Sequence, residues 1–232
     1  MLADQLDQSG FALVSGILTR ADIAILIELF ARTDISRSER DGETYGVRNL
    51  LMLPEVRRVA GLDALAIHLR PLLGPRFQAV RGLFFDKTLG ANWPVLWHQD
   101  LSLAVKAQVE VTGWSNWSIK RGVTHVQPPA AILARMVTVR LHLDDCPATN
   151  GPLRVIPRSH RDGVLPRPAI QDAVANRPVE TVMAATGDAL FMKPLILHAS
   201  SPAMSPGHRR VLHLEFAPAG LLPTELSWAE TA

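Results

Sequence analysis

The chain has 232 residues, of which 47% are hydrophobic and 20% charged, and this composition favours one globular domain over residues 1–232. Its 24 lysines and arginines nearly balance 22 aspartates and glutamates, unlike the basic excess of nucleic-acid-binding proteins, so we expect no nucleic-acid partner. No apolar run reaches about 18 residues and no secretory signal is recognisable, so we expect no membrane contact. The single cysteine, Cys146, excludes an internal disulfide and favours a cytoplasmic protein.

The first helix is predicted over residues 21–32, after Thr19, whose hydroxyl can cap it. Its apolar residues recur at the spacing of one helix face: Ile23, Leu26, Ile27 and Phe30. The next residues, 33–47, are polar and contain glycine, and are interpreted as a loop.

A second helix is predicted over about residues 55–73. Gly61 and Pro71 should disturb it, and Gly74 should end it. Residues 1–75 are therefore expected to form a helical N-terminal part.

Short strands are predicted after Pro75. They are the runs FQAVRGLFFDK, MVTVRLHLDD, LRVIPRSH, DALFMKPLILH and RRVLHLEFAP, separated by clusters of proline, glycine and asparagine. Helices followed by strands, with no helical pattern between the later strands, predict an α+β, mainly β fold. Its core, residues 76–218, should be a sandwich or a barrel.

Two histidines and one aspartate are candidate metal ligands. His98 and Asp100 are two residues apart beside a predicted strand end, so their side chains share one face of an extended chain. His198 ends another apolar run. Two imidazoles and one carboxylate form the facial triad that binds iron(II) and leaves other positions open. The alternative is that His198 is a buried histidine satisfied by a backbone group.

Four motifs occur in a consistent order: WHQD, NGPLRVIPRSH, GDALFMKPLILH and HRRVLHLEF. With them, residues 77–218 resemble the phytanoyl-CoA dioxygenase family of iron(II)- and 2-oxoglutarate-dependent oxygenases. The resemblance implies a double-stranded β-helix core, of the jelly-roll or cupin type, with the N-terminal helices packed on it. It also implies that His98, Asp100 and His198 ligate Fe(II), and that 2-oxoglutarate and O₂ are cosubstrates.

An arginine for the far carboxylate of 2-oxoglutarate is also implied. The family places it eleven positions after the second histidine, which selects Arg209. Alternation along RRVLHLEF agrees, because it puts Arg209 on the face opposite the apolar residues, which should pack outward. Ser200 matches a family position that hydrogen-bonds the same carboxylate. The alternatives are a surface arginine beside Arg210 and a serine that only supports a turn.

Two further arginines are candidate cosubstrate residues. Arg140 lies on the polar face of MVTVRLHLDD, where many relatives carry a tryptophan, so the sequence departs from the family pattern there. Its buried charge needs a partner, either a carboxylate of cosubstrate or substrate or an internal salt bridge. Arg48 roughly matches a basic family position near the cosubstrate, and a solvated arginine is the alternative.

The function that these features predict is hydroxylation of a small molecule with 2-oxoglutarate as cosubstrate. Asp100 favours oxygen transfer, because halogenating relatives replace this carboxylate with a small residue that makes room for halide. Two rivals remain: a cupin-like metalloenzyme that does not use 2-oxoglutarate, and a non-catalytic jelly-roll binding module. A monomer or a homodimer is expected.

Residues 101–135 are predicted to be an insertion that closes over the substrate. A connection of this length exceeds the two to six residues or so that are usual between neighbouring strands, and long loops of this kind often act as lids. Trp114 and Trp117 would contact the substrate, and cations such as Lys120 would meet an acidic group on it. The alternative is that the tryptophans only pin the loop to the barrel.

Overall fold

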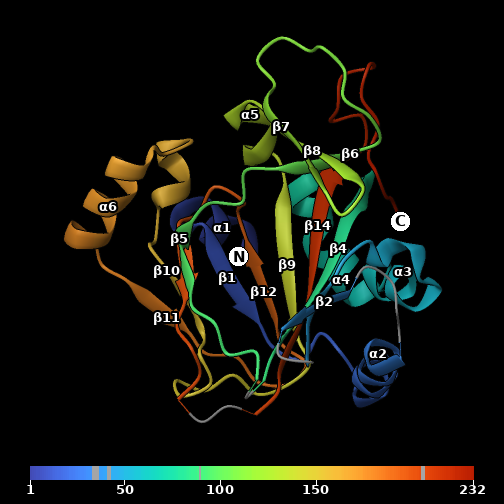
Figure 1. Ribbon diagram of the computed structural model, residues 1–232, viewed down its shortest axis with the longest axis vertical. Helices are drawn as coiled ribbons and strands as arrows, with labels where there is room; N and C mark the ends of the chain where they lie inside the picture. The colour runs from blue at the N-terminus through green and yellow to red at the C-terminus, as the bar shows by residue number, and fades with distance from the viewer. Residues whose placement is uncertain (33–36, 41–42, 89, 205–206) are drawn as a thin grey trace.

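Two antiparallel β-sheets form the centre of the computed structural model, which describes residues 1–32, 37–40, 43–88, 90–204 and 207–232 (Figure 1). The larger sheet has the order β1 (Phe11–Val14), β12 (Ala189–Met192), β9 (Val137–His142), β14 (Arg209–Pro218), β4 (Phe77–Lys87), β3 (Glu43–Val47) and β2 (Arg37–Arg40). The smaller sheet has the order β11 (Glu180–Val182), β10 (Leu153–Val155), β13 (His198–Ser200) and β5 (Val95–His98). The predicted α+β, mainly β fold class is confirmed.

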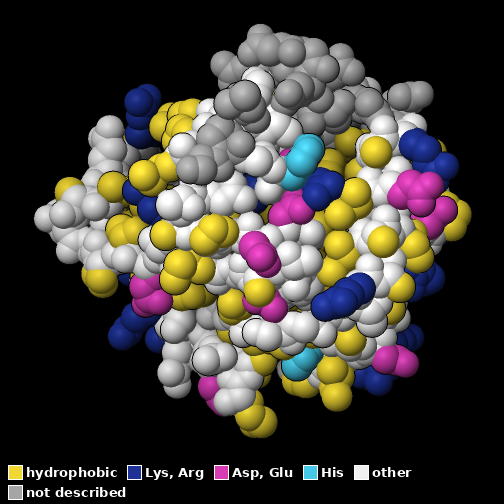
Figure 2. Space-filling model, turned by 90° about the horizontal axis from the view of Figure 1, so that it is seen from below, with side chains coloured by type: hydrophobic (Ala, Val, Ile, Leu, Met, Phe, Trp, Pro, Cys, Tyr) yellow, Lys and Arg dark blue, Asp and Glu magenta, His cyan; other side chains and the backbone are white. Residues whose placement is uncertain are grey.

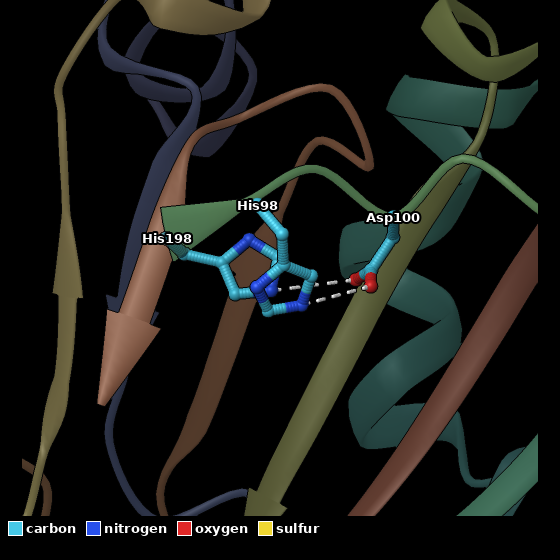
Figure 3. A group of neighbouring side chains, drawn as sticks. All are labelled: His98, Asp100 and His198. Atoms are coloured by element: carbon cyan, nitrogen blue, oxygen red, sulfur yellow. Dashed lines mark ion pairs between the residues drawn. The ribbon is translucent and has the colours of Figure 1, made fainter. Parts of the chain in front are cut away.

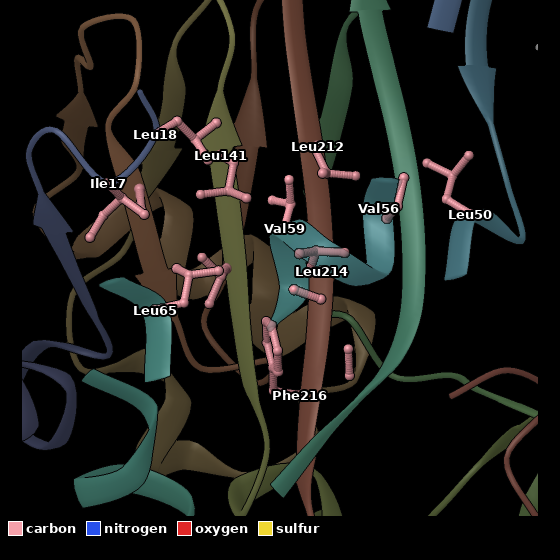
Figure 4. Packing of buried hydrophobic residues seen from close by; sticks show 14 of the residues in the cluster. Ile17, Leu18, Leu50, Val56, Val59, Leu65, Leu141, Leu212, Leu214 and Phe216 are labelled. Carbon is pink, nitrogen blue, oxygen red and sulfur yellow. The ribbon is translucent and has the colours of Figure 1, made fainter. Parts of the chain in front are cut away.

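Helices cover the outer face of the larger sheet. They are α2 (Arg20–Arg32), α3 (Pro54–Ala60) and α4 (Asp63–Leu73), and the short 3-10 helix η1 (Leu50–Met52) precedes α3. Val59 and Leu65 of these helices pack in one buried cluster with Leu141, Leu214 and Phe216 of the sheet (Figure 4). The other described helices are α1 (Leu2–Ser9), α5 (Ala130–Ala134), η2 (Ser159–Asp162) and α6 (Arg167–Asn176).

The first predicted helix begins as its sequence suggests. The backbone N–H of Asp22 donates to the Thr19 hydroxyl at 3.2 Å, and the backbone N–H of Thr19 donates to the Asp22 carboxylate at 3.1 Å. These reciprocal bonds satisfy the donors that a helix start leaves unpaired.

The second predicted helix is in fact two. Gly61 follows α3 and separates it from α4, whereas Pro71 lies inside α4 without ending it. Pro71 lies on an exposed part of the helix, so its ring needs no space in the core. Gly74, with φ of 85°, ends α4 as predicted, because only glycine adopts this conformation without strain.

The prediction of a loop over residues 33–47 was wrong for the part that is described. Strands β2 and β3 lie there, and Gly46 and Val47 pair with β4. Residues 33–36 and 41–42 lie outside the described residues. These strands are mostly polar and lie at the end of the sheet, so they lack the apolar alternation that reveals a half-buried strand. With β1, they make the N-terminal part only partly helical.

The central strands divide their side chains between two environments. On β14, Leu212, Leu214 and Phe216 join the buried cluster under the helices. The alternate residues Arg209 and Glu215 line a cavity on the other face of the sheet. The strand therefore has the two faces that its sequence pattern predicts.

The predicted insertion, residues 101–135, is structured and is not an irregular loop. It contains β6 (Leu103–Val105), β7 (Ser115–Lys120), β8 (Val123–Gln127) and α5 (Ala130–Ala134), and the strands form a separate small sheet in the order β6, β8, β7. Arg121 and Gly122, with φ of 51° and 77°, form the turn between β7 and β8. Two successive positive φ angles characterise the type I′ hairpin turn. The Arg-Gly pair is a weak sequence signal for this turn, and β7 is largely exposed, so the hairpin was missed.

One face of the molecule is seen in Figure 2, where the described acidic and basic side chains are interspersed rather than gathered into a field of one sign. Among the described helices, none has both the length and the apolar character required to cross a membrane.

Candidate active site

The three candidate metal ligands converge on the cavity between the two sheets. His98 ends β5 and His198 begins β13, and these two residues face each other in the antiparallel strand pair. Asp100 follows two residues after His98. Its Oδ1 lies 3.8 Å from His98 Nε2 and its Oδ2 lies 3.7 Å from His198 Nε2 (Figure 3). One potential ligand atom from each residue lies within 4.8 Å of the others, so a single metal ion could contact all three.

Each histidine ring is oriented by the backbone carbonyl group two residues earlier in the chain. His98 Nδ1 lies 2.7 Å from the Leu96 carbonyl oxygen, and His198 Nδ1 lies 2.9 Å from that of Ile196. A carbonyl oxygen only accepts, so each Nδ1 carries the proton and each Nε2 keeps its lone pair for a metal. The alternative role for His198 thus accounts for one ring nitrogen and leaves the other available.

The charges of these groups suit a cation. Burial lowers the pKa of His198 to about 4, so its ring is neutral at pH 7. Burial alone would raise the pKa of Asp100, but the neighbouring imidazoles of His198, His213 and His98 lower it to about 2. Asp100 is therefore ionised, and among the described residues its Oδ2 has no hydrogen-bond partner.

Gln99, between two of the candidate ligands, holds their segment in place. Its side chain is buried and donates to the carbonyl oxygens of Gly163 and Leu195, both at 2.7 Å, and accepts from the Leu165 N–H at 2.8 Å. Sequence reasoning missed this residue. The signal was available, because alternation that turns His98 and Asp100 to one side must turn Gln99 to the other.

The cavity has a volume of about 440 Å³ and contains two groups of cations. Its walls include the candidate ligands and residues of both sheets. Arg209 and Glu215 both line it from β14, and six residues of strand span roughly 20 Å, so the cavity extends well beyond the candidate metal centre. We call one group the Arg209 cluster (Arg140 and Arg209, with Lys87 behind the cavity wall) and the other the Lys120 cluster (Arg48, Arg81 and Lys120).

Arg209 is a buried residue of the cavity wall. It is 5% exposed, which excludes the alternative of a surface arginine. Its guanidinium group donates to the Gly151 carbonyl oxygen, and among the described residues its Nε has no hydrogen-bond partner. The adjacent Arg210 points elsewhere and forms a two-bond ion pair with Asp144, at 2.5 and 2.8 Å.

Arg140, in the same cluster, is buried on β9 and has no carboxylate partner within ion-pair distance among the described residues. It donates to His213 Nδ1 at 3.1 Å. Burial and the charge of Arg209 lower the pKa of Arg140 to about 10, which still leaves it charged at pH 7. The internal salt bridge considered for this residue is thus not formed in the described part of the chain.

Residues of the insertion line the other end of the cavity. Arg81 of β4 donates to Glu215 at 3.0 Å and to the Ser102 carbonyl oxygen at 3.3 Å. Its second guanidinium nitrogen lies 3.3 Å from Nε2 of His125, on β8. Burial, the main cause, lowers the pKa of His125 to about 4, so its neutral ring can accept from Arg81. Arg81 therefore joins the insertion to the larger sheet.

Residues 6–211 match the model of the family described as Phytanoyl-CoA dioxygenase (PhyH). The chain belongs to this family. The match covers most of the chain, including the candidate ligands and Arg209, and it confirms the resemblance recognised in the sequence. No curated protein matches the chain in sequence.

Solved structures show that this family member shares its fold with known jelly-roll proteins. SnoN, a non-haem α-ketoglutarate-dependent epimerase from nogalamycin biosynthesis, has 20% identity and a TM-score of 0.68, with 94% of this chain and 81% of that chain covered. AviO1 from Streptomyces viridochromogenes Tue57 has 22% identity and a TM-score of 0.67, with 96% of each chain covered. HygX from Streptomyces hygroscopicus, solved with nickel and 2-oxoglutarate bound, has 16% identity and a TM-score of 0.68, with 95% and 88% covered.

The remaining predicted residues divide between the cavity and the core. Arg48 lines the cavity, where it lies near Lys120 and His125. Neither Trp114 nor Trp117 is among the described lining residues, and Trp114 packs against a buried cluster that includes Leu103. Packing therefore accounts for Trp114 in this conformation of the family member, and a substrate contact by either tryptophan stays a prediction.

Proposed function

We propose that this member of the family is an Fe(II)- and 2-oxoglutarate-dependent oxygenase that hydroxylates a small-molecule substrate. The observation that carries this proposal is the convergence of His98, Asp100 and His198 at a cavity that also contains the buried Arg209. A cosubstrate that chelates a metal at one end and carries a free carboxylate at the other requires both elements.

The donor set suits Fe(II). Two imidazole nitrogens and one carboxylate oxygen are the facial set typical of non-haem iron(II) oxygenases, and they leave positions for further ligands. Each Nδ1 is held by a carbonyl group, so each Nε2 is available, and Asp100 Oδ2 is a buried anion without a hydrogen-bond partner among the described residues. A buried carboxylate oxygen of this kind is stabilised when a cation binds it.

When bound, Fe(II) with 2-oxoglutarate and O₂ supplies the oxidative decarboxylation to succinate and CO₂ and the oxidation of a substrate C–H bond. The residues of this chain bind the cosubstrate and the substrate and orient them. Arg209 and Ser200 would hold the far carboxylate of 2-oxoglutarate, with Arg140 adding positive charge beside them. The insertion would exclude water from the opposite end.

Oxygen transfer is the outcome that Asp100 supports, because its carboxylate fills the position that halogenating relatives leave to halide. A cupin-like enzyme without 2-oxoglutarate would keep the triad but would have no use for the Arg209 cluster. A non-catalytic binding module would need neither. Two arginines buried in the wall of a cavity that holds an intact ligand set, Arg140 and Arg209, therefore favour the oxygenase over both rivals.

Anaerobic titration tests the proposal directly. Addition of Fe(II) and then 2-oxoglutarate is expected to give a weak visible absorption band, because the 1-carboxylate and 2-keto oxygens chelate the metal. Succinate, which has no keto group, is the control and should give no band. Absence of the band at stoichiometric bound iron contradicts the proposal. In turnover, hydroxylation adds one oxygen to the mass of the substrate, whereas epimerisation, the reaction of SnoN, leaves it unchanged.

For the substrate, we propose a small molecule with an acidic group that binds at the Lys120 cluster. Arg48, Arg81 and Lys120 all line the cavity, and Glu215 is the carboxylate paired with Arg81. Lys120 donates to the Ser102 hydroxyl oxygen over a long distance, 3.4 Å. The positive charge of Lys120, which lines the cavity from the insertion, is complementary to an anion.

Replacing Lys120 with methionine is expected to raise the KM for the substrate roughly threefold to tenfold, the effect of one partly exposed ion pair, and to leave the KM for 2-oxoglutarate unchanged. Lys106→Met is the matched control, because Lys106 belongs to the same insertion but does not line the cavity. The substrate is found by screening carboxylates against their amides for substrate-dependent succinate formation. Equal turnover of the carboxylates and their amides would contradict the proposal that the substrate carries an acidic group.

Hydrogen exchange tests whether the insertion closes. With iron and 2-oxoglutarate present, substrate should protect residues 110–130, and Trp114→Ala or Trp117→Ala should raise the KM for the substrate more than that for 2-oxoglutarate. Exchange that is indifferent to substrate, with normal turnover of both variants, would make the insertion purely structural.

A further inference from the structure

Lys87 is a buried lysine that the proposed mechanism has not used. It is the last residue of β4, only 1% exposed, and it lies directly opposite Arg209 on β14. Ser200 and Arg209 line the cavity, whereas Lys87 is not among the described lining residues. Lys87 therefore lies behind the wall that Ser200 presents to a ligand.

The contacts of Lys87 are specific. Its Nζ donates to the Ser200 hydroxyl oxygen at 3.1 Å and to the Ser201 carbonyl oxygen at 2.8 Å, and it lies 5.6 Å from the centre of the Trp93 ring. No carboxylate of the described residues lies within ion-pair distance of it. A buried ammonium group without a carboxylate is costly, so its retention calls for a second stabilising group.

We propose that Lys87 is a positioning residue for the cosubstrate, because its contact with Ser200 turns the serine hydroxyl proton into the cavity, toward the far carboxylate of 2-oxoglutarate. This inference rests on the proposed function. An ammonium group only donates, so the Ser200 oxygen must accept from it, and the hydroxyl proton is left to point elsewhere. An uncharged amine has a lone pair and can accept that proton instead, which would remove the donor from the cavity.

The charge of Lys87 is sensitive to what binds nearby. Burial and the charges of Arg209 and Arg140 lower its pKa to about 7. The other titratable groups that face this cluster are His142, whose pKa burial lowers to about 3, and Cys146, whose pKa burial raises, so both are uncharged at pH 7. A bound dicarboxylate stabilises the charged form of Lys87. The affinity for 2-oxoglutarate should therefore be highest below pH 7 and should fall as the pH rises above it.

The test is calorimetric binding of 2-oxoglutarate to the Fe(II)-loaded protein without oxygen. Lys87→Met should weaken binding roughly threefold to tenfold, which corresponds to one hydrogen bond, with iron binding unchanged. Lys193→Met is the matched control, because Lys193 is partly buried and donates to a backbone carbonyl oxygen, that of Ala134 at 3.2 Å, but its hydrogen bond is not to Ser200. Lys87→Gln provides a second variant if the methionine protein does not fold.

Ser200→Ala separates positioning from a general effect of charge. If Lys87 acts through the serine, Lys87→Met should change the affinity of the Ser200→Ala protein by less than twofold, and the decline in affinity above pH 7 should be smaller in that background. Equal effects of Lys87→Met in both backgrounds overturn the inference, as does wild-type affinity in Lys87→Met. A wild-type protein that binds iron but not 2-oxoglutarate overturns the proposed function itself.

Discussion

Replacing Asp100 with alanine is expected to reduce substrate oxidation to background while the barrel remains folded. The substitution removes the anionic member of the candidate ligand set and leaves two imidazoles, which bind a divalent cation much more weakly than the complete set. The fold should survive, because its buried apolar cluster lies on the other face of the larger sheet.

The measurements for Asp100→Ala are iron content, succinate formation and thermal unfolding. Asp144→Ala is a suitable control, because it makes the same change at a carboxylate that pairs with Arg210 away from the cavity. Turnover near the wild-type rate with iron bound would show that Asp100 is not the carboxylate ligand.

Replacing Arg209 with alanine is expected to weaken 2-oxoglutarate binding roughly tenfold to a hundredfold, because a charge-assisted bidentate pair contributes about 1.5–3 kcal/mol. Iron binding should be retained, since the guanidinium group is not among the candidate ligands. The neighbouring residue gives a matched control, because Arg210 pairs with Asp144 and does not line the cavity.

Two results would contradict this assignment. An unchanged affinity for 2-oxoglutarate in Arg209→Ala would indicate that another residue binds its far carboxylate. Arg140, which lines the same cavity, would then be the candidate. A loss as large in Arg210→Ala as in Arg209→Ala would indicate a structural effect on β14 rather than a lost contact. Equilibrium binding without oxygen distinguishes these cases, because it does not depend on the later oxidation.

Local patterns in the sequence were sufficient for the parts of the site that lie on one strand. The period of two along β14 separates Arg209 from the apolar residues around it, and the same period brings His98 and Asp100 to one side. Assignment of the ligands as a set needed the family resemblance as well, because nothing local relates His198 to residues about a hundred positions earlier.

The pairing and register of strands that are distant along the chain could not be predicted from the sequence. The position of Lys87 behind Ser200 depends on the register of β4 against β14, and the contact of Arg140 with His213 depends on that of β9 against β14. The strands of the insertion were missed for a different reason. Their side chains do not alternate between a core and solvent, so the pattern that identifies a half-buried strand is absent.

The two-sided register of the larger sheet also bears on how such proteins diverge. Along these strands, residues that pack against the helices alternate with residues that line the cavity. A substitution at a cavity position therefore leaves the packing against the helices unchanged. A descendant could therefore acquire a new substrate, or a different oxidative outcome, by substitutions at every second position while its scaffold persists. Chains with about one residue in five identical, such as this one and SnoN, can thus share a scaffold.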